Sequence, residues 1–182
     1  TIEDEIASRV VEELRGKLLG EEKAKLTKHG TANAEAYELY LKGRYHWNRR
    51  SPKDQVMAVD YFQRAIDKDP RYALPYVGIA DVFNMLAEFG FIRPREAYLK
   101  SRSLLQKALE IDDSLSDLYA SLALITYAYE WDLPAAERHA RRSIELNPLN
   151  SWAHGWRAEI LGTQGRIEEA FEEAKKGVEI DP

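Results

Sequence analysis

The chain has 182 residues, of which 45% are hydrophobic and 31% charged, with a net charge of −5 at neutral pH. This apolar content is enough for a folded core and excludes a disordered tail. A pI near 5.5 argues against nucleic-acid binding as the main activity, because nucleic-acid binders present a basic surface. The sequence contains no cysteine, which excludes disulfides, a thiolate nucleophile and a cysteine-based zinc site.

Residues 1–31 are predicted to form an amphipathic helix and a linker. The helix covers residues 1–20, and the charged residues 21–31 then form the linker or a second short helix. The helix could pack as a cap on the elements that follow, or it could be the end of a preceding domain, free to dimerise. Its apolar positions recur every four residues, at Ile2, Ile6, Val10, Leu14 and Leu18. Because the chain starts with neither Met nor a signal peptide, we expect it to be a piece of a longer protein.

A short motif recurs four times along the rest of the chain. Its final positions, 70, 113, 148 and 182, are 43, 35 and 34 residues apart. Three of the four copies end in proline, and the residue before a proline is disfavoured in the α region, so each copy is predicted to end a helix. The copies are RAIDKDP at 64–70, KALEIDD at 107–113, RSIELNP at 142–148 and KGVEIDP at 176–182.

A second helix is predicted before each of these helices. In the first copy, Ser51, Pro52 and Asp54 supply an N-cap, a proline at the first helical position and an acidic residue in the first turn. Asp132 and Gly165 mark the corresponding turns in later copies. The repeating unit is therefore a helical hairpin of about 34 residues.

This period and its small residues resemble the tetratricopeptide repeat (TPR) family. In the last copy, the small residues and the terminal proline fall at the family's positions, namely Gly165, Ala170, Ala174, Gly177 and Pro182. The resemblance implies an all-α, right-handed α-solenoid of about four hairpins with an N-terminal helix. The array occupies 32–182, with repeats at 36–72, 73–115, 116–150 and 151–182 and with extra residues near 49–55, 88–96 and 130–133.

The amino-acid sequence of the first repeat is similar to that of one group of bacterial multidomain signalling proteins. Residues 33–48, 61–62 and 69–73 carry this similarity. In that group, such arrays follow a TolB-like domain and are attached to adenylate or guanylate cyclase, winged-helix regulator or kinase modules. The resemblance implies a non-catalytic protein–protein interaction or regulatory scaffold within a larger protein. The alternatives are a fragment of an enzyme whose catalytic domain lies outside this chain, and a small-ligand or glycan-binding array.

The sequence itself offers no catalytic, cofactor or metal site. The four histidines are scattered without metal-ligand spacing, and no phosphate-binding or nucleophile motif is present. The longest apolar stretch, 122–131, is far shorter than the roughly 20 residues that span a bilayer. We therefore expect no cofactor, no metal and no membrane insertion. We expect a cytoplasmic location, with the periplasm as the alternative.

By resemblance, the concave groove of such an array is lined by the first helix of each hairpin. Aromatic residues and arginine there would anchor a protein or peptide segment, or another domain of the parent chain. Instead of binding a partner, Tyr37, Trp47 and Trp152 could pack between adjacent repeats. Tyr40 and Val77 replace the groove residues that hold a terminal carboxylate in chaperone-binding members, so an internal segment is expected as ligand. The candidate partner-binding residues are Tyr37, Tyr40, Arg44, Trp47, Asn48, Asp81, Asn84, Tyr127, Trp152 and Glu159.

Two further surfaces are candidates for contacts. Basic residues in the first two inter-helix turns could form an edge that attracts an anionic partner; they are Arg49, Arg50, Lys53, Arg93 and Arg95. The last helix is expected to expose an apolar flank that includes Phe171, Val178 or Ile160. A homodimer through such exposed ends of the array is the corresponding hypothesis.

Overall fold

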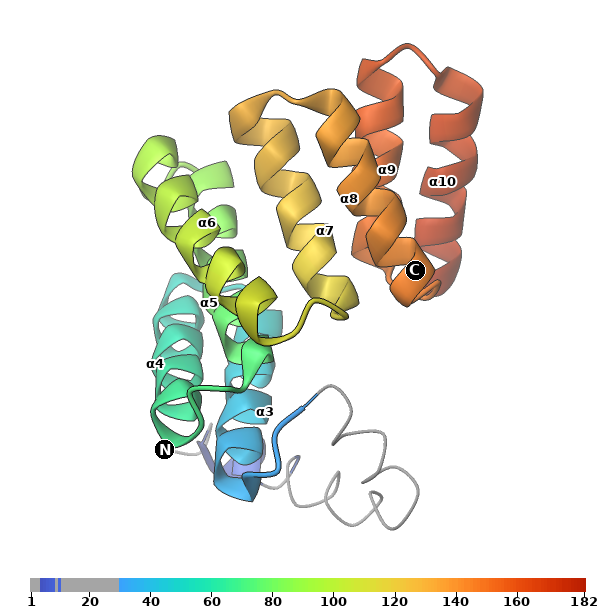
Figure 1. Cartoon of the computed structure of the whole chain (residues 1–182). Helices are drawn as coiled ribbons and strands as arrows, with labels where there is room; N and C mark the ends of the chain where they lie inside the picture. Colours follow the sequence, from blue (N-terminus) through green and yellow to red (C-terminus); the bar gives the residue numbers. More distant parts are fainter. Residues whose placement is uncertain (1–3, 9, 11–29) are drawn as a thin grey trace.

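The computed structural model describes residues 4–8, 10 and 30–182, and these residues form helices and no strand (Figure 1). The helices are α3 (Ala34–Arg49), α4 (Pro52–Lys68), α5 (Ala73–Glu88), α6 (Pro94–Ile111), α7 (Ser116–Ile125), the π-helical turn η1 (Thr126–Glu130), α8 (Leu133–Leu146), α9 (Ser151–Thr163) and α10 (Ile167–Ile180).

Consecutive helices pack in pairs, α3 with α4, α5 with α6, α7 with α8 and α9 with α10. The first helix of each pair also contacts the first helix of the next pair, so the four hairpins follow one another in a curved array (Figure 1). The predicted all-α solenoid is therefore confirmed.

The predicted helix starts are confirmed by their hydrogen bonds. The Ser51 side chain accepts from the Asp54 N–H, and Pro52 is the first residue of α4. Asp132 accepts from the Ala135 N–H in the same way at the start of α8. These caps fix where α4 and α8 begin.

Two of the inter-helix turns that carry extra residues differ in how they accommodate them. The turn between α5 and α6 is a loop in which Gly90 has a φ of 72°. In the third hairpin, α7 widens into η1, and Trp131 then adopts a left-handed φ of 58° while the Asp132 N–H bonds to the Thr126 carbonyl. A π-turn takes up one more residue than an α-turn, which explains the extra residue predicted near 130–133.

The main apolar core extends from α3 into α7. Phe62 of α4 is fully buried at its centre, between Gly43 of α3 and Gly78 of α5. A smaller, separate cluster joins α7, α8 and α9 through Ala123, Ala136, Ala140 and Ile160. Apolar packing is thus concentrated in the first three hairpins.

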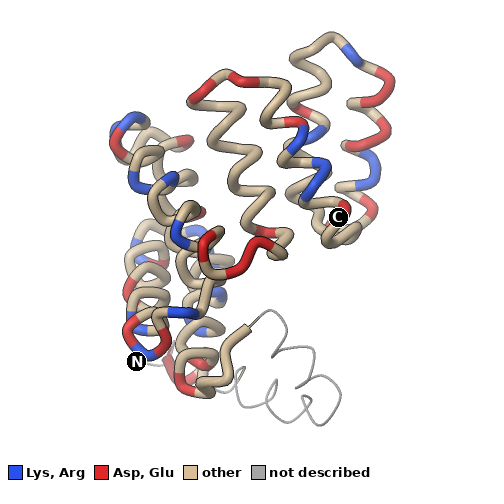
Figure 2. The backbone as a smooth tube through the Cα atoms, viewed as in Figure 1, with Lys and Arg blue, Asp and Glu red and all other residues tan. Residues whose placement is uncertain are grey.

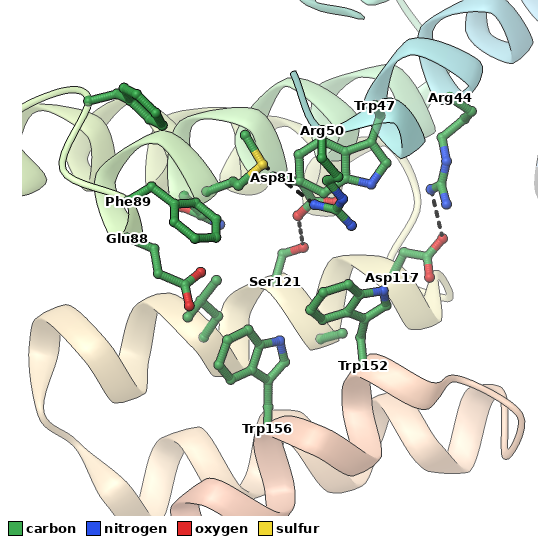
Figure 3. Close-up of a pocket in the computed structure, with 15 residues that line it drawn as sticks. Arg44, Trp47, Arg50, Asp81, Glu88, Phe89, Asp117, Ser121, Trp152 and Trp156 are labelled. Atoms are coloured by element: carbon green, nitrogen blue, oxygen red, sulfur yellow. Dashed lines mark hydrogen bonds and ion pairs between the residues drawn. The ribbon is translucent and has the colours of Figure 1, made fainter. Parts of the chain in front are cut away.

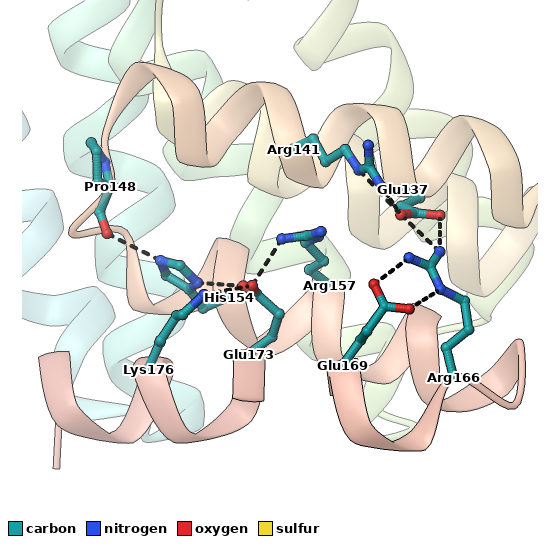
Figure 4. Close-up of polar contacts among 9 residues, drawn as sticks. All are labelled: Glu137, Arg141, Pro148, His154, Arg157, Arg166, Glu169, Glu173 and Lys176. Atoms are coloured by element: carbon teal, nitrogen blue, oxygen red, sulfur yellow. Dashed lines mark hydrogen bonds and ion pairs between the residues drawn. The ribbon is translucent and has the colours of Figure 1, made fainter. Parts of the chain in front are cut away.

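Polar side chains connect the fourth hairpin internally and to the third (Figure 4). The buried Glu173 accepts hydrogen bonds from Arg157 at 2.8 Å and Lys176 at 3.0 Å, and lies 2.7 Å from the Nδ1 of His154. Between the hairpins, Arg166 donates to both carboxylate oxygens of Glu137 at 3.0 Å. Charge-assisted bonds therefore do here what apolar contacts do in the first three hairpins.

Charged residues of both signs are interspersed along the helices, including α4, α6, α8 and α10 (Figure 2). Many form ion pairs one helical turn apart, such as Arg141 with Glu137 at 2.7 Å. Such exposed pairs add little stability, so the fold depends mainly on the core described above.

Only part of the predicted N-terminal helix can be compared, because residues 1–3, 9 and 11–29 lie outside the described residues. Residues 4–8 and 10 are helical. Ala7 is buried, and Asp4 accepts a hydrogen bond from the Tyr61 hydroxyl of α4. Ile6 and Val10, which belong to the predicted apolar stripe, remain 44% and 40% exposed. Among the described residues of this segment, the buried one is therefore Ala7, which follows Ile6 of the predicted stripe by one position.

Candidate functional site

A cavity of about 570 Å³ lies on the side of the array formed by the first helices of the hairpins (Figure 3). Its walls come from α3, α5, α7 and α9 and from the loop after α5, so residues more than 100 positions apart in sequence share it. The lining residues are Arg44, Trp47, Arg50, Asp81, Asn84, Met85, Glu88, Phe89, Phe91, Asp117, Ala120, Ser121, Leu124, Trp152 and Trp156.

Arg50 lies between two tryptophans at one side of the cavity. It is the C-cap of α3 and has a left-handed φ of 58°. Its guanidinium carbon lies 3.9 Å from the centre of the Trp47 ring and 5.4 Å from that of Trp152. The two indoles belong to the first and the fourth hairpin, so Arg50 bridges the ends of the groove by cation–π contacts.

Asp81 of α5 and Asp117 of α7 add carboxylates to the cavity. Asp81 is half-buried and accepts a hydrogen bond from the Ser121 hydroxyl. Burial, together with the nearby charge of Asp117, raises the pKa of Asp81 to about 7. Asp117 itself lies 4.0 Å from Arg44 and accepts a 3.0 Å hydrogen bond from Asn150.

The opposite side of the cavity is aromatic and carries Glu88 (Figure 3). Phe89 and Phe91, which follow α5, are 67% and 61% exposed at its rim. Asn84, only 1% exposed, contributes an amide whose oxygen and nitrogen have no hydrogen-bond partner within the described part of the chain. Unpaired buried amides are rare, but both polar atoms of this one are covered by the protein, so the rim of this side is formed by the exposed phenylalanines.

Five of the ten predicted groove residues come together at this cavity. They are Arg44, Trp47, Asp81, Asn84 and Trp152. Trp152 is 53% exposed and stacks on Trp156 at 6.2 Å, whereas Trp47 is buried beneath Arg50. The alternative of pure packing between repeats therefore describes Trp47 better than Trp152.

The other five predicted residues lie elsewhere. Tyr40 is buried, with its ring 5.3 Å from that of Tyr72 and 5.8 Å from that of Phe62. Tyr37 packs partly against the same core. The remaining three do not line the cavity: Asn48 and Glu159 are exposed, and Tyr127 bonds to Thr163 at 3.0 Å. A tyrosine on the inner side of a helix can pack into the core instead of lining the groove. This explains why Tyr40 is buried and does not reach the cavity.

Two expectations about the surface are wrong. Arg50 was expected on a basic outer edge, but its left-handed conformation turns it into the cavity, while Arg49 pairs with Asp54 at 3.5 Å. Ile160 was named as part of the exposed last flank, but it is fully buried in the small apolar cluster that joins α7, α8 and α9. Phe171 and Val178 of that flank are exposed as expected, by 66% and 64%.

Several cavity residues escaped prediction from the sequence. Trp156 was missed because it lies one helical turn after Trp152, outside the positions that the family resemblance assigns to the groove. Phe89 and Phe91 were missed because they belong to the loop with extra residues. Two phenylalanines flank a glycine in that loop, and this aromatic cluster could have indicated an exposed binding surface.

The described side chains of the cavity are of kinds that can bind a ligand. Within the described residues, no cluster of three or more His, Asp or Glu side chains could hold a metal ion. No described helix has both the length and the apolar content needed to cross a bilayer. The cavity presents two guanidinium groups, several carboxylates and a set of aromatic rings.

Comparison with known proteins agrees with this architecture. Residues 139–172 match the tetratricopeptide repeat family. The thermophilic TPR protein TTC0263 of Thermus thermophilus superposes with a TM-score of 0.67 at 19% identity, over 88% of this chain and 79% of that one. The fold is a tetratricopeptide-repeat solenoid.

Two further similarities concern proteins with a stated ligand or role. The first TPR of Spaghetti (RPAP3), bound to an HSP90 peptide, superposes with a TM-score of 0.56 at 19% identity, over 75% of this chain and 98% of that one. The transcriptional regulator HilA of Salmonella typhimurium is 22% identical over 147 residues. That match covers 79% of this chain but only 26% of the regulator, so the chain spans about a quarter of that relative's length.

Proposed function

We propose that this TPR array is a non-catalytic interaction scaffold that holds a protein segment in the groove between α3, α5, α7 and α9. The observation that carries the proposal is the cavity, where Trp152 and Trp156 stack at 6.2 Å beside Arg50. Tryptophan and arginine are the residues most enriched among the anchors of protein interfaces. Their concentration in one concave place supports recognition of a partner there.

The relatives support a place within a larger regulatory protein. HilA is named a transcriptional regulator, and this chain corresponds to about a quarter of it. We infer that the array is the interaction region of a longer bacterial signalling protein, acting in the cytoplasm, with any enzymatic activity in other domains. The bound segment would come from another protein or from a different domain of the same parent chain.

A small-ligand receptor is the second candidate function. A volume of about 570 Å³ lies within the range of small-molecule pockets, roughly 300–1,000 Å³. The exposed Phe89 and Phe91 at the rim favour the protein segment, because a longer ligand can cover them as well.

Selection of peptides from a random library displayed on phage tests the proposal. Peptides that bind the chain should lose at least about tenfold in affinity when Trp152→Ala removes an anchor of the groove. Phe171→Ala is the matched control, because Phe171 is also an exposed aromatic but lies on α10, outside the cavity. Peptides that bind both variants equally well would contradict a groove function.

A further inference from the structure

Arg50 is a cation that is still exposed to solvent at the cavity, although the two tryptophans shield part of it, and it has no acidic partner among the described residues. No carboxylate oxygen of the described residues lies within 4.0 Å of its guanidinium, and its one polar contact is from Nη1 to the Met85 sulfur at 3.5 Å. A thioether is a weak acceptor, and a guanidinium has five N–H donors to fill. Burial lowers the pKa of Arg50, because the protein removes water that would stabilise the charge.

Two of the nearby acids, Asp81 and Asp117, are already engaged, and Glu88, whose charge also acts on Arg50, lies on the opposite side of the cavity. Asp81 accepts from Ser121, and Asp117 accepts from Asn150 and lies near Arg44. The two indoles hold the Arg50 guanidinium on its faces, which leaves its N–H edges as the groups that can still donate. A ligand that brings one carboxylate would complete this site with charge-assisted hydrogen bonds.

The surroundings define the rest of the ligand. Met85 contacts Arg50, and Leu124 and Trp156 also line the cavity, so its wall suits an apolar group. A phosphate fits less well, because its second negative charge would add to the repulsion from Asp117 and the other carboxylates of the cavity.

We propose that Arg50, held between Trp47 and Trp152, binds the side-chain carboxylate of an internal Asp or Glu in a bound protein segment, with a large apolar residue of that segment beside it. The proposal rests on the function proposed above and names what the groove recognises. It requires no free chain terminus, because the carboxylate comes from a side chain. The exposed aromatic rim is what a segment longer than a single small acid would cover.

The test uses two short peptides blocked at both ends, acetyl-Gly-Phe-Glu-Gly-amide and its Gln analogue. Titration is followed by the indole N–H signals of the chain in NMR spectra. The Glu peptide should bind at least tenfold more tightly than the Gln peptide. Arg50→Gln should abolish this difference, while Arg64→Gln should preserve it. Arg64 is a matched control, since its guanidinium lies 5.3 Å from the Tyr61 ring on α4, outside the cavity.

Equal binding of the Glu and Gln peptides to the unmodified chain would overturn the proposal, and this comparison holds even if Arg50→Gln impairs folding. A preference for Glu that survives Arg50→Gln in a folded variant would overturn it as well. Binding of free 3-phenylpropionate without binding of the Glu peptide would exclude a protein segment as the occupant. If display-selected peptides depend on Trp152 but show no preference for Glu over Gln, the scaffold function stands and only the carboxylate site fails.

Discussion

The ring of Phe62 on α4 lies directly against the backbone of Gly43 on α3. A Cβ atom placed on Gly43 would come within 2.5 Å of ring carbons of Phe62, and one on Gly78 would come within 2.6 Å from another helix. The ring therefore fills the space between two glycines and cannot move away from one without approaching the other.

Replacing Gly43 by alanine should destabilise the chain. Alanine gains about 1 kcal/mol over glycine inside a helix, but overpacking a fixed ring costs about 1–3 kcal/mol. We expect the second effect to dominate and the urea midpoint to fall. Gly155→Ala is the control, because nothing lies within 4 Å of its added Cβ, and this variant should be stabilised instead. A Gly43→Ala variant as stable as the parent would mean that the helices pack less closely.

Asp81 should make stability depend on pH. Its pKa is raised by burial to about 7, against 3.8 in the absence of the protein's influence. Between these values the folded chain holds a proton that the unfolded chain releases, so the stabilisation is complete below about pH 4 and is lost as the pH rises through 7. Asp81→Asn should therefore flatten the stability curve between pH 4 and 7, as measured by chemical unfolding at each pH. Parallel curves for variant and parent would place the pKa of Asp81 in its ordinary range.

The same carboxyl should affect the proposed ligand. Asp81 is surrounded by Ser121, Asp117, Arg44 and Arg50, and its ionisation above pH 7 adds a negative charge to the cavity. Binding of the Glu peptide should therefore weaken between pH 6 and 8, whereas Asp81→Asn should bind it equally at both. Isothermal titration measures this difference. A parent chain whose affinity for the Glu peptide does not change over this interval would show that Asp81 is remote from the bound carboxylate.

Removing Glu173 should destabilise the fourth hairpin. Burial tends to raise the pKa of Glu173, but hydrogen bonds from His154 and Lys176 and the charge of Arg157 outweigh it and hold the pKa below its usual range. Glu173→Ala removes the carboxylate that pairs with Arg157 and Lys176 and should cost about 3 kcal/mol, typical of breaking a buried ion pair. Glu169→Ala removes a carboxylate from an exposed pair with Arg166 and should change the melting temperature little. Similar melting temperatures for the two variants would contradict the role given to Glu173.

The exposed flank of α10 should cause self-association at high concentration. Phe171 and Val178 are 66% and 64% exposed on one helix, and apolar surfaces of this kind favour contacts between copies. Light scattering should show a mass that rises with concentration, and Phe171→Glu should keep the chain monomeric. A parent chain that stays monomeric at every concentration would disprove this hypothesis.

The repeat and its helix boundaries follow from local rules, whereas the cavity does not. Ser51 and Asp132 cap helices because of bonds that span three residues, so the sequence around them is sufficient. The meeting of Arg50 with Trp152 depends on how four hairpins stack, and no local pattern determines the curvature of that stack. Even the side to which Arg50 points depends on one left-handed residue, which a basic turn sequence did not indicate.

The unequal distribution of the apolar core gives the cavity one firm wall and one more easily displaced wall. Arg50 and Trp47 belong to the part with the large core, whereas Trp152 and Trp156 belong to a hairpin held mostly by hydrogen bonds and ion pairs. A segment bound between them would join the two parts, so occupancy should slow amide hydrogen exchange in α9 and α10 more than in α3. The position and stability of the last hairpin would then depend on whether a ligand is bound.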